Sequence, residues 1–172
     1  MMKIDPLKTF VTSDHHFGSS ELPFLHVFTP EQEIDLIKKW NSVVKQDDLV
    51  LYNGDFCDGD EESSLLKFKS RLNGHIVLIK GNHDKLSDDV YKKVFDDVID
   101  QLVLEDMNLV IQHKPKLCNM NQVYGHMHRG YVVGPLDKSS NFCSCVQAHD
   151  GFPVRLDEVL KSFTQQTYQA DC

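Results

Sequence analysis

Short apolar runs rich in β-branched and aromatic residues recur along the chain and predict strands. The expected strands cover Thr9 to Thr12, Leu49 to Tyr52, Ile76 to Ile79, Val98 to Leu104, Leu109 to Gln112, Gln122 to Tyr124, Asn141 to Val146 and Phe152 to Leu156. Several of these runs end in a cluster of polar residues. We therefore expect the chemistry of the protein to lie on loops at strand ends.

Apolar positions at helical spacing occupy the gaps between the early strands. The clearest helix follows Thr29, where Pro30 suits the first helical position and Gln32 completes a capping box. Further helices are expected at Glu61 to Leu72, Ser87 to Phe95 and Leu156 to Phe163. Because strands and helices alternate early and strands follow one another later, with a hairpin turn at 104–107, the pattern predicts an α/β sandwich whose second half is antiparallel.

Length and composition are those of a globular domain. The 172 residues are 41% hydrophobic and 26% charged, and the sequence contains neither an internal repeat nor a low-complexity linker. We therefore expect a single domain, residues 1–172, that folds around its own core.

Charge and cysteine usage narrow the class of partner. A net charge of −8 disfavours the broad basic surface that binds long DNA or RNA, so long nucleic acid is not an expected partner. Two bound cations would still make one pocket positive, which leaves a small phosphorylated substrate as the expected partner. The five cysteines lack C-x-x-C spacing, which argues against a disulfide framework. No leader peptide or membrane span is indicated, and we expect a cytoplasmic protein.

Residue types that bind metals follow the predicted strands. Asp14 and His16 follow the first strand, and side chains two apart in extended chain point the same way. Asp55 follows the second strand, at the end of a sheet where α/β proteins place ligand groups. Taken alone, each segment is more often an ordinary polar turn than a metal site.

The later strands end in more specific blocks. These blocks are Gly81-Asn82-His83-Asp84, His113 and Gly125-His126-Met127-His128. A simple turn gains nothing from the histidine of the first block. The histidine pair of the last block is spaced too closely for a helical H-x3-H site, and a pair of surface histidines is the alternative interpretation.

In this order, the blocks D-x-H, G-D, G-N-H-D, H and G-H-x-H resemble the calcineurin-like metallophosphoesterase superfamily over residues 9–156. The chain is most similar to its short stand-alone prokaryotic and phage members, through D-x-H-F-G at Asp14 to Gly18 and W-N at Trp40-Asn41. Those relatives often carry another histidine where this chain has Ser19. The resemblance implies a layered α-β-β-α sandwich with two mixed sheets and a metal site on loops at strand ends.

The resemblance also implies a dinuclear metal centre. The first ion would be held by Asp14, His16, Asp55 and His128, and the second by Asp55, Asn82, His113 and His126. This mixed nitrogen and oxygen set suits Mn²⁺, Fe, Co²⁺ or Zn²⁺, and of these we expect Mn²⁺. His83 would act as the catalytic acid at the leaving group, with Asp84 orienting it.

The expected function is hydrolysis of a small phosphodiester or phosphomonoester, such as a nucleotide or cyclic nucleotide. The alternatives are a nuclease acting on short single-stranded nucleic acid and a non-catalytic metal-binding scaffold of the same fold. Two residues have two interpretations each. His15 either supports the first metal or is partly exposed, and Asp58 either approaches the site or belongs to an acidic surface turn.

Overall fold

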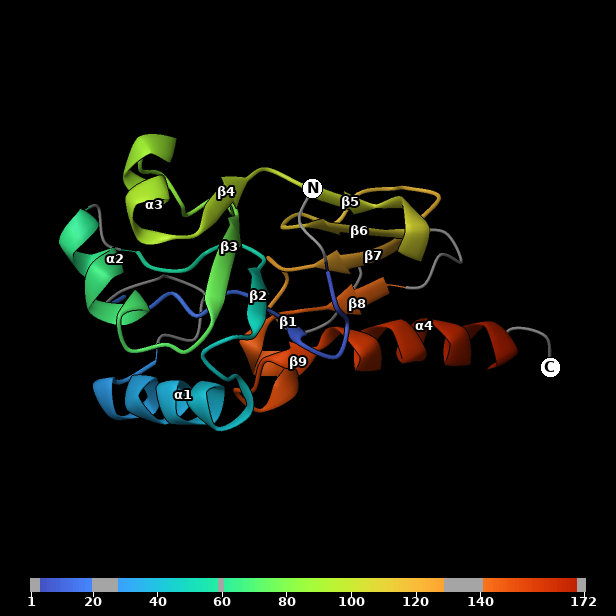
Figure 1. The fold of residues 1–172 in the computed structure, drawn as a ribbon, viewed down its shortest axis with the longest axis horizontal. Coiled ribbons are helices and arrows are strands. Elements are labelled where there is room, and N and C mark those ends of the chain that lie inside the picture. The colour runs from blue at the N-terminus through green and yellow to red at the C-terminus, as the bar shows by residue number, and fades with distance from the viewer. Residues whose placement is uncertain (1–3, 20–27, 59–60, 129–140, 170–172) are drawn as a thin grey trace.

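The computed structural model describes residues 4–19, 28–58, 61–128 and 141–169, with side chains up to residue 163. In chain order the elements are β1 (Thr9–Thr12), α1 (Pro30–Val43), β2 (Leu49–Tyr52), α2 (Glu62–Lys69), β3 (His75–Ile79), α3 (Asp88–Val94), β4 (Asp97–Ile99), β5 (Leu102–Leu104), β6 (Leu109–Gln112), β7 (Asn121–Tyr124), β8 (Asn141–Cys143), β9 (Val154–Arg155) and α4 (Leu156–Gln169). Strands and helices alternate as far as β4, as the apolar pattern predicts (Figure 1).

The first sheet has the strand order β4-β3-β2-β1-β9, in which β1 to β4 run parallel and β9 is antiparallel. The register pairs Thr12 with Tyr52 and Tyr52 with Leu78, so β1, β2 and β3 end almost level. The loops after these strands therefore open at one edge of the sheet, where α/β sheets bind ligands.

The second sheet has the order β5-β6-β7-β8. The predicted hairpin between β5 and β6 is confirmed, with a 3-10 turn at Glu105–Met107 between the two antiparallel strands. The prediction that the rest of this half is antiparallel is wrong, because β6, β7 and β8 run parallel. Residues 113–120 carry the chain from the end of β6 back to the level at which β6 begins, so β7 runs in the same direction as β6. The apolar pattern of a strand does not show its direction, so the sequence could not distinguish the two arrangements.

One predicted strand is divided between the two sheets. Residues 98–104 were expected to form one strand, but β4 pairs with β3 and β5 pairs with β6. The polar pair Asp100 and Gln101 lies between them and carries the chain from one sheet to the other. The two last predicted strands are also shorter, at Asn141–Cys143 and Val154–Arg155.

The first helix begins where the sequence predicts. The Thr29 side chain accepts a hydrogen bond from the Gln32 N–H, and the Gln32 side chain accepts one from the Thr29 N–H. This capping box satisfies two N–H groups that a helix start leaves unpaired. Trp40 on the same helix is completely buried.

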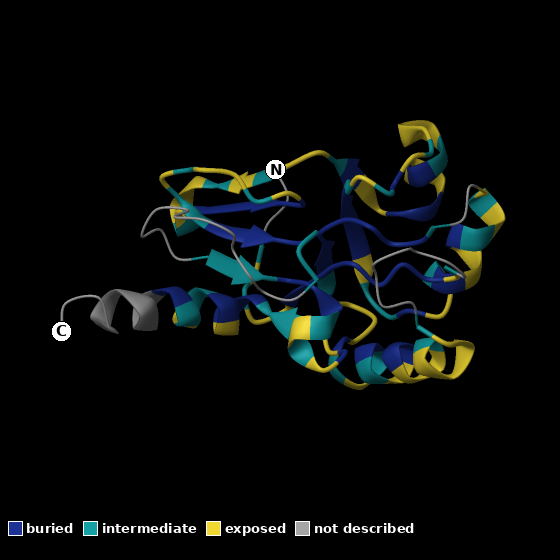
Figure 2. Ribbon diagram, turned by 180° about the vertical axis from the view of Figure 1, so that it is seen from behind, coloured by how far each residue is buried: buried dark blue, intermediate teal, exposed yellow. Residues whose placement is uncertain are grey.

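Two apolar layers enclose the first sheet. One face, including Phe10, Val50 and Leu78, packs against residues of the helices such as Trp40 and Phe68. The other face packs against the second sheet, and its members are Val11, Leu51, Val77 and Ile79, with Leu109, Ile111 and Val123 opposite. The strands β1, β2, β3, β6 and β7 are mostly buried, whereas the edge strands β5 and β8 are partly exposed (Figure 2). The predicted α/β sandwich of two mixed sheets is confirmed.

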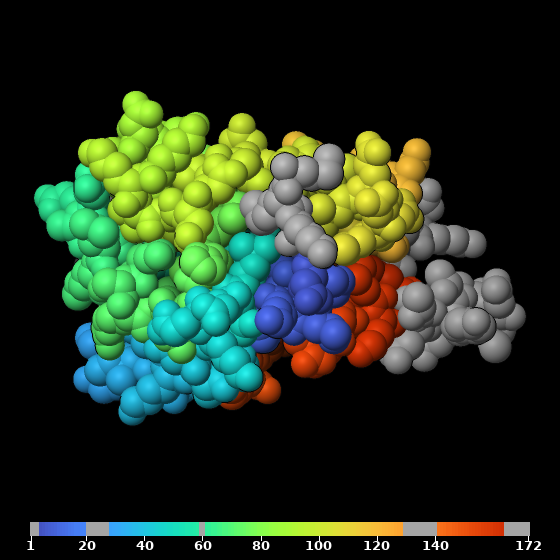
Figure 3. Space-filling model, in the orientation of Figure 1, coloured from blue at the N-terminus to red at the C-terminus, as the bar shows by residue number. Residues whose placement is uncertain are grey.

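The last helix, α4, contacts β1 and β9 of the first sheet and β8 of the second. Its residues Leu156, Val159 and Phe163 join the core between the sheets. The N-terminal segment lies between the start of α4 and the segment before β2 (Figure 3), where the Pro6 carbonyl accepts a hydrogen bond from Asp157 and the Lys8 carbonyl one from Leu49. Within the described part of the chain, no helix has the length and apolar character to cross a bilayer.

Candidate metal centre

Six of the seven predicted metal ligands meet where β1, β2, β6 and β7 end. They form two groups of three, and in each group the ligand atoms lie within 4.8 Å of one another. The first group is Asp14, His16 and His128, and the second is Asp55, His113 and His126. Because β6 and β7 are parallel, both sheets contribute the ends of their strands to the same place.

Asp55 stands between the two groups. Its Oδ2 atom lies 3.2 Å from Nε2 of His113 and 3.7 Å from Nε2 of His16. In the first group, Nε2 of His128 lies 3.4 Å from Oδ1 of Asp14. One carboxylate oxygen therefore faces histidines of both groups, which is the position that a ligand bridging two cations requires.

Two of the histidines present unsatisfied nitrogen atoms to the centre. Nε2 of His16 and Nε2 of His113 are buried and complete no hydrogen bond. The opposite ring nitrogens are held, because Nδ1 of His113 lies 2.8 Å from the Asn53 carbonyl oxygen and Nδ1 of His16 lies 3.0 Å from Asp58. An Nδ1–H that donates to a carbonyl leaves the Nε2 lone pair free to bind a metal. Buried polar atoms without a partner are rare, and these residues fit a pair of divalent cations.

The electrostatics of the centre also favour cations. Burial raises the pKa of Asp55, but the neighbouring His113 and His16 outweigh it and lower the pKa to about 2. Burial lowers the pKa of His113, but the Asp55 carboxylate outweighs it and raises the pKa to about 8. Burial, followed by the positive charges of His113 and Lys114, lowers the pKa of His126. An ionised carboxylate and a neutral imidazole are the forms that bind metals, so Asp55 and His126 are ready to bind a cation, whereas His113 must first lose a proton.

The backbone is strained at the same residues. Of the described non-glycine residues, those with positive φ are Asp14 (61°), His16 (46°), Asp55 (58°), Asn108 (48°), His126 (68°), His128 (52°) and Asp150 (52°). Five of these are predicted ligands. Left-handed backbone outside glycine costs on the order of 1 kcal/mol per residue and concentrates at functional sites.

Glycines allow the carboxylates to approach the backbone. A Cβ atom at Gly81 would lie 2.2 Å from Oδ1 of Asp55, and one at Gly125 would lie 2.7 Å from Oδ2 of Asp14. Both distances are far below van der Waals contact. The glycines that open the G-N-H-D and G-H-x-H blocks are therefore required by the position of the two aspartates.

The structure reassigns the partner of His83. Nδ1 of His83 lies 3.2 Å from Oδ1 of Asp58, whose other oxygen lies 3.0 Å from His16. The expectation that Asp84 orients His83 is wrong. The Asp84 carboxylate is buried and accepts hydrogen bonds from the backbone N–H groups of Asp55, Phe56 and Gly81. Asp84 thus fastens the loop after β2 to the loop after β3.

Asp58 lies beside the site, in contact with His16 and His83, and is not part of an acidic surface turn. It is the second aspartate of the run Gly54-Asp55-Phe56-Cys57-Asp58, and the spacing of three residues was the available signal. Burial raises the pKa of Asp58, but His16 and further neighbours outweigh it and lower the pKa below its ordinary value. Asp58 is therefore an ionised partner for two histidines.

Two further buried residues adjoin the predicted ligands: His15, which stands between Asp14 and His16 in the chain, and Cys145, which contacts Asp14. His15 is completely buried, which excludes the partly exposed interpretation, and its Nδ1 lies 2.8 Å from the hydroxyl of Tyr52. Cys145 donates a hydrogen bond from Sγ to Oδ2 of Asp14 over 3.3 Å. None of the four described cysteines forms a disulfide bond. Because these contacts join segments far apart in the chain, local sequence patterns do not reveal them.

Asn82, the seventh predicted ligand, is exposed. It lines a hollow of about 300 Å³ together with His113 and three lysines. It therefore lies beside the second group, on the side that faces solvent.

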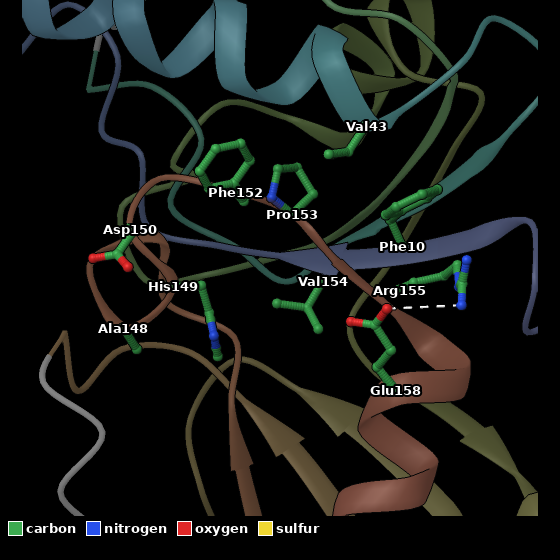
Figure 4. A pocket seen from close by; sticks show the side chains of 10 residues that line it. All are labelled: Phe10, Val43, Ala148, His149, Asp150, Phe152, Pro153, Val154, Arg155 and Glu158. Carbon is green, nitrogen blue, oxygen red and sulfur yellow. Dashed lines mark ion pairs between the residues drawn. The ribbon is translucent and has the colours of Figure 1, made fainter.

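A larger hollow, of about 670 Å³, lies elsewhere and contains none of the predicted site residues. Its wall includes Phe10, Val43, Phe152 and Arg155 (Figure 4). Arg155 pairs with Asp157 and Glu158, so its charge is already neutralised. The volume of a hollow thus does not locate the chemistry of this protein.

Comparison with protein families gives one assignment. The sequence profile of a family described as calcineurin-like phosphoesterase matches residues 7–144. Over 171 residues the chain is 28% identical to an uncharacterized protein of Methanocaldococcus jannaschii, with 90% of each chain covered.

Two solved structures are similar in fold. A protein of unknown function from Aquifex aeolicus superposes with a TM-score of 0.70 at 20% identity, covering 89% of this chain and 97% of that one. Nuclease MPE of Pseudomonas putida gives a TM-score of 0.53 at 21% identity, covering 75% of this chain and 66% of that one.

Proposed function

The chain belongs to the calcineurin-like phosphoesterase family, whose members are metal-dependent phosphoesterases, and from this premise we propose that it hydrolyses small phosphoesters with two divalent metal ions. The observation that carries the proposal is the position of Asp55 between two groups of buried histidines and carboxylates. Asp14, His16, Asp55 and His128 would hold the first ion, and Asp55, Asn82, His113 and His126 the second. We propose Mn²⁺ as the ion.

When bound, two such ions lower the pKa of an attacking water and stabilise negative charge around phosphorus. The chain itself fixes the ligands before any ion arrives. The Asn53 carbonyl orients His113, Asp58 orients His16, and the Asp84 carboxylate holds the two loops that carry Asp55 and Gly81. Such preorganisation avoids rearrangement when the substrate binds.

We propose His83 as the proton donor. Its side chain is 28% exposed, whereas the side chains of His16 and His113 are 5% and 3% exposed, so a substrate reaches His83 more easily than either of them. Asp58 contacts Nδ1 and orients the ring, which leaves Nε2 to donate a proton to the departing alkoxide oxygen. In this proposal Asp58 is a positioning residue and His83 is the catalytic acid.

The test is a screen of the metal-loaded protein against phosphomonoesters, phosphodiesters, cyclic nucleotides and short oligonucleotides. We expect turnover of at least one class, beginning with bis-p-nitrophenyl phosphate. His83→Ala is expected to keep its metal and lose about 100-fold or more in turnover, the usual contribution of a general acid. His75→Ala is the control, because His75 is exposed at the opposite end of β3 and pairs with Asp96. Normal turnover by His83→Ala would remove its proposed role.

A nuclease acting on short single strands is the second candidate. The fold resemblance to nuclease MPE and the lysines beside the centre favour it, while the net charge of −8 disfavours long nucleic acid. Cleavage of oligonucleotides much faster than of mononucleotide diesters would favour this candidate. A protein that binds Mn²⁺ yet hydrolyses none of the substrate classes would instead be a metal-binding scaffold.

A further inference from the structure

The hollow of about 300 Å³ beside the second metal group is lined mainly by positive charges, although the protein as a whole is acidic. The chain carries a net charge of −8, yet Lys80, Lys114 and Lys116 all line this hollow, and Asp100 is the only acidic residue among its described lining. His113, from the second metal group, forms part of the same wall. A basic hollow thus adjoins the candidate metal centre.

Two of the three lysines keep their charge available. Nζ of Lys80 lies 2.7 Å from Oδ1 of Asp88, which neutralises much of its charge. Lys114 and Lys116 are exposed, and neither forms an ion pair with any side chain that the structure describes. Their ammonium groups are therefore free to bind an anion.

The buried side-chain amide of Gln122 holds the loop that carries Lys114 and Lys116. Oε1 of Gln122 accepts a hydrogen bond from the Lys116 N–H over 2.9 Å, and Nε2 of Gln122 donates to the Lys116 carbonyl over 3.1 Å. Gln122 is only 1% exposed and also donates to Asn141. A backbone held at both its N–H and its carbonyl places the lysines in advance, which lowers the entropy lost on binding.

Lys114 also connects the hollow to the metal centre. It follows His113 directly, and both residues line the hollow. An anion bound by Lys114 and Lys116 would therefore lie beside His113, a proposed ligand of the second ion.

We propose that this hollow is a subsite for a second phosphate group of the substrate. The inference rests on the proposed phosphoesterase function and adds the substrate class, a phosphoester that carries another phosphate. Lysine binds phosphate as a point charge, so the subsite recognises the charge and its distance from the reacting phosphorus. The second phosphate can be attached across a nucleoside or directly as a diphosphate, and the experiment separates the two.

The experiment measures dissociation constants for the Mn²⁺-loaded protein by titration calorimetry. The ligands are thymidine 5′-monophosphate, thymidine 3′,5′-bisphosphate and thymidine 5′-diphosphate. Exposed lysine ion pairs contribute about 0.2 to 1 kcal/mol each, which predicts that one of the two-phosphate ligands binds about twofold to thirtyfold more tightly than the monophosphate. The ligand that gains shows how the second phosphate is attached.

The double variant Lys114→Met, Lys116→Met should bring the affinity ratio close to one. The matched control is Lys38→Met, which should leave the ratio unchanged. Lys38 is exposed on α1 and is not among the described residues that line the hollow. Added salt should reduce the ratio in the unmodified protein. Equal affinity for all three ligands, or a ratio that survives the double variant, would overturn the proposed subsite. Because binding needs no turnover, a lysine-dependent ratio without hydrolysis would support the subsite and refute the hydrolase.

Discussion

Replacement of Asp84 tests whether the two metal-binding loops are held together as the structure indicates. In Asp84→Ala, the N–H groups of Asp55, Phe56 and Gly81 lose their common acceptor. In Asp84→Asn, one oxygen remains, but the amide NH₂ faces a backbone donor. Both changes should therefore lower the free energy of unfolding, and Asp84→Ala should lower it more than Asp84→Asn.

The expected loss follows from the burial of the three donors. Asp55 and Phe56 are 1% and 0% exposed, whereas Gly81 is half-buried and can bind water instead. Burial raises the pKa of Asp84, so removing the carboxylate also relieves some cost of a buried charge. Two orphaned N–H groups at about 1 to 3 kcal/mol each, less that relief, predict about 1 to 4 kcal/mol for Asp84→Ala and about 1 to 2 kcal/mol for Asp84→Asn.

Urea unfolding, followed by the fluorescence of the buried and only tryptophan, Trp40, measures this loss. The measurement is made with EDTA, because bound metal would add its own stabilisation. With a slope of about 2 kcal/mol per molar urea, the midpoint of Asp84→Ala should fall by about 0.5 to 2 M. Asp89→Ala, an exposed aspartate in the first turn of α3, is the control. A midpoint for Asp84→Ala equal to that of the control would refute the role of Asp84.

Three further predictions concern the metal centre. Gly81→Ala places a Cβ atom 2.2 Å from Oδ1 of Asp55, so Mn²⁺ affinity measured by calorimetry should fall about 10-fold or more; unchanged affinity would refute the close approach. Tyr52→Phe removes the partner of the buried His15 ring and should cost about 1 to 2 kcal/mol in thermal unfolding, and an unchanged midpoint would contradict that contact. His113, whose pKa is raised to about 8, must lose its proton to bind metal, so Mn²⁺ affinity should fall as pH drops below that value and binding should release protons into the buffer. Metal uptake without proton release at neutral pH would contradict this assignment.

The sequence predicts the elements of this fold better than their directions. The capping box at Thr29 and the apolar runs are local features, and the structure has them where expected. The direction of β7 relative to β6 and the division of residues 98–104 between two sheets depend on pairing with distant strands. No local pattern encodes such pairing.

The candidate site shows the same division between local and distant information. Six ligands could be proposed from their positions after strands, because parallel strands end at one edge of a sheet. The partner of His83 could not be predicted from the sequence. Asp84 is its neighbour in the chain, whereas Asp58 is its neighbour only in the folded structure, and both are acidic. Only the coordinates show that Asp58 faces the ring while Asp84 binds the backbone.

The central claim is that Asp55 joins two metal ions that hydrolyse a phosphoester. The most direct measurement follows bis-p-nitrophenyl phosphate hydrolysis by EDTA-treated protein as Mn²⁺ is added, with the metal content determined in the same samples. We predict that the rate rises with metal content until two ions are bound per chain, and that Asp55→Asn neither holds two ions nor reaches this rate. Full activity with one ion per chain, or two ions and full activity in Asp55→Asn, would contradict the claim.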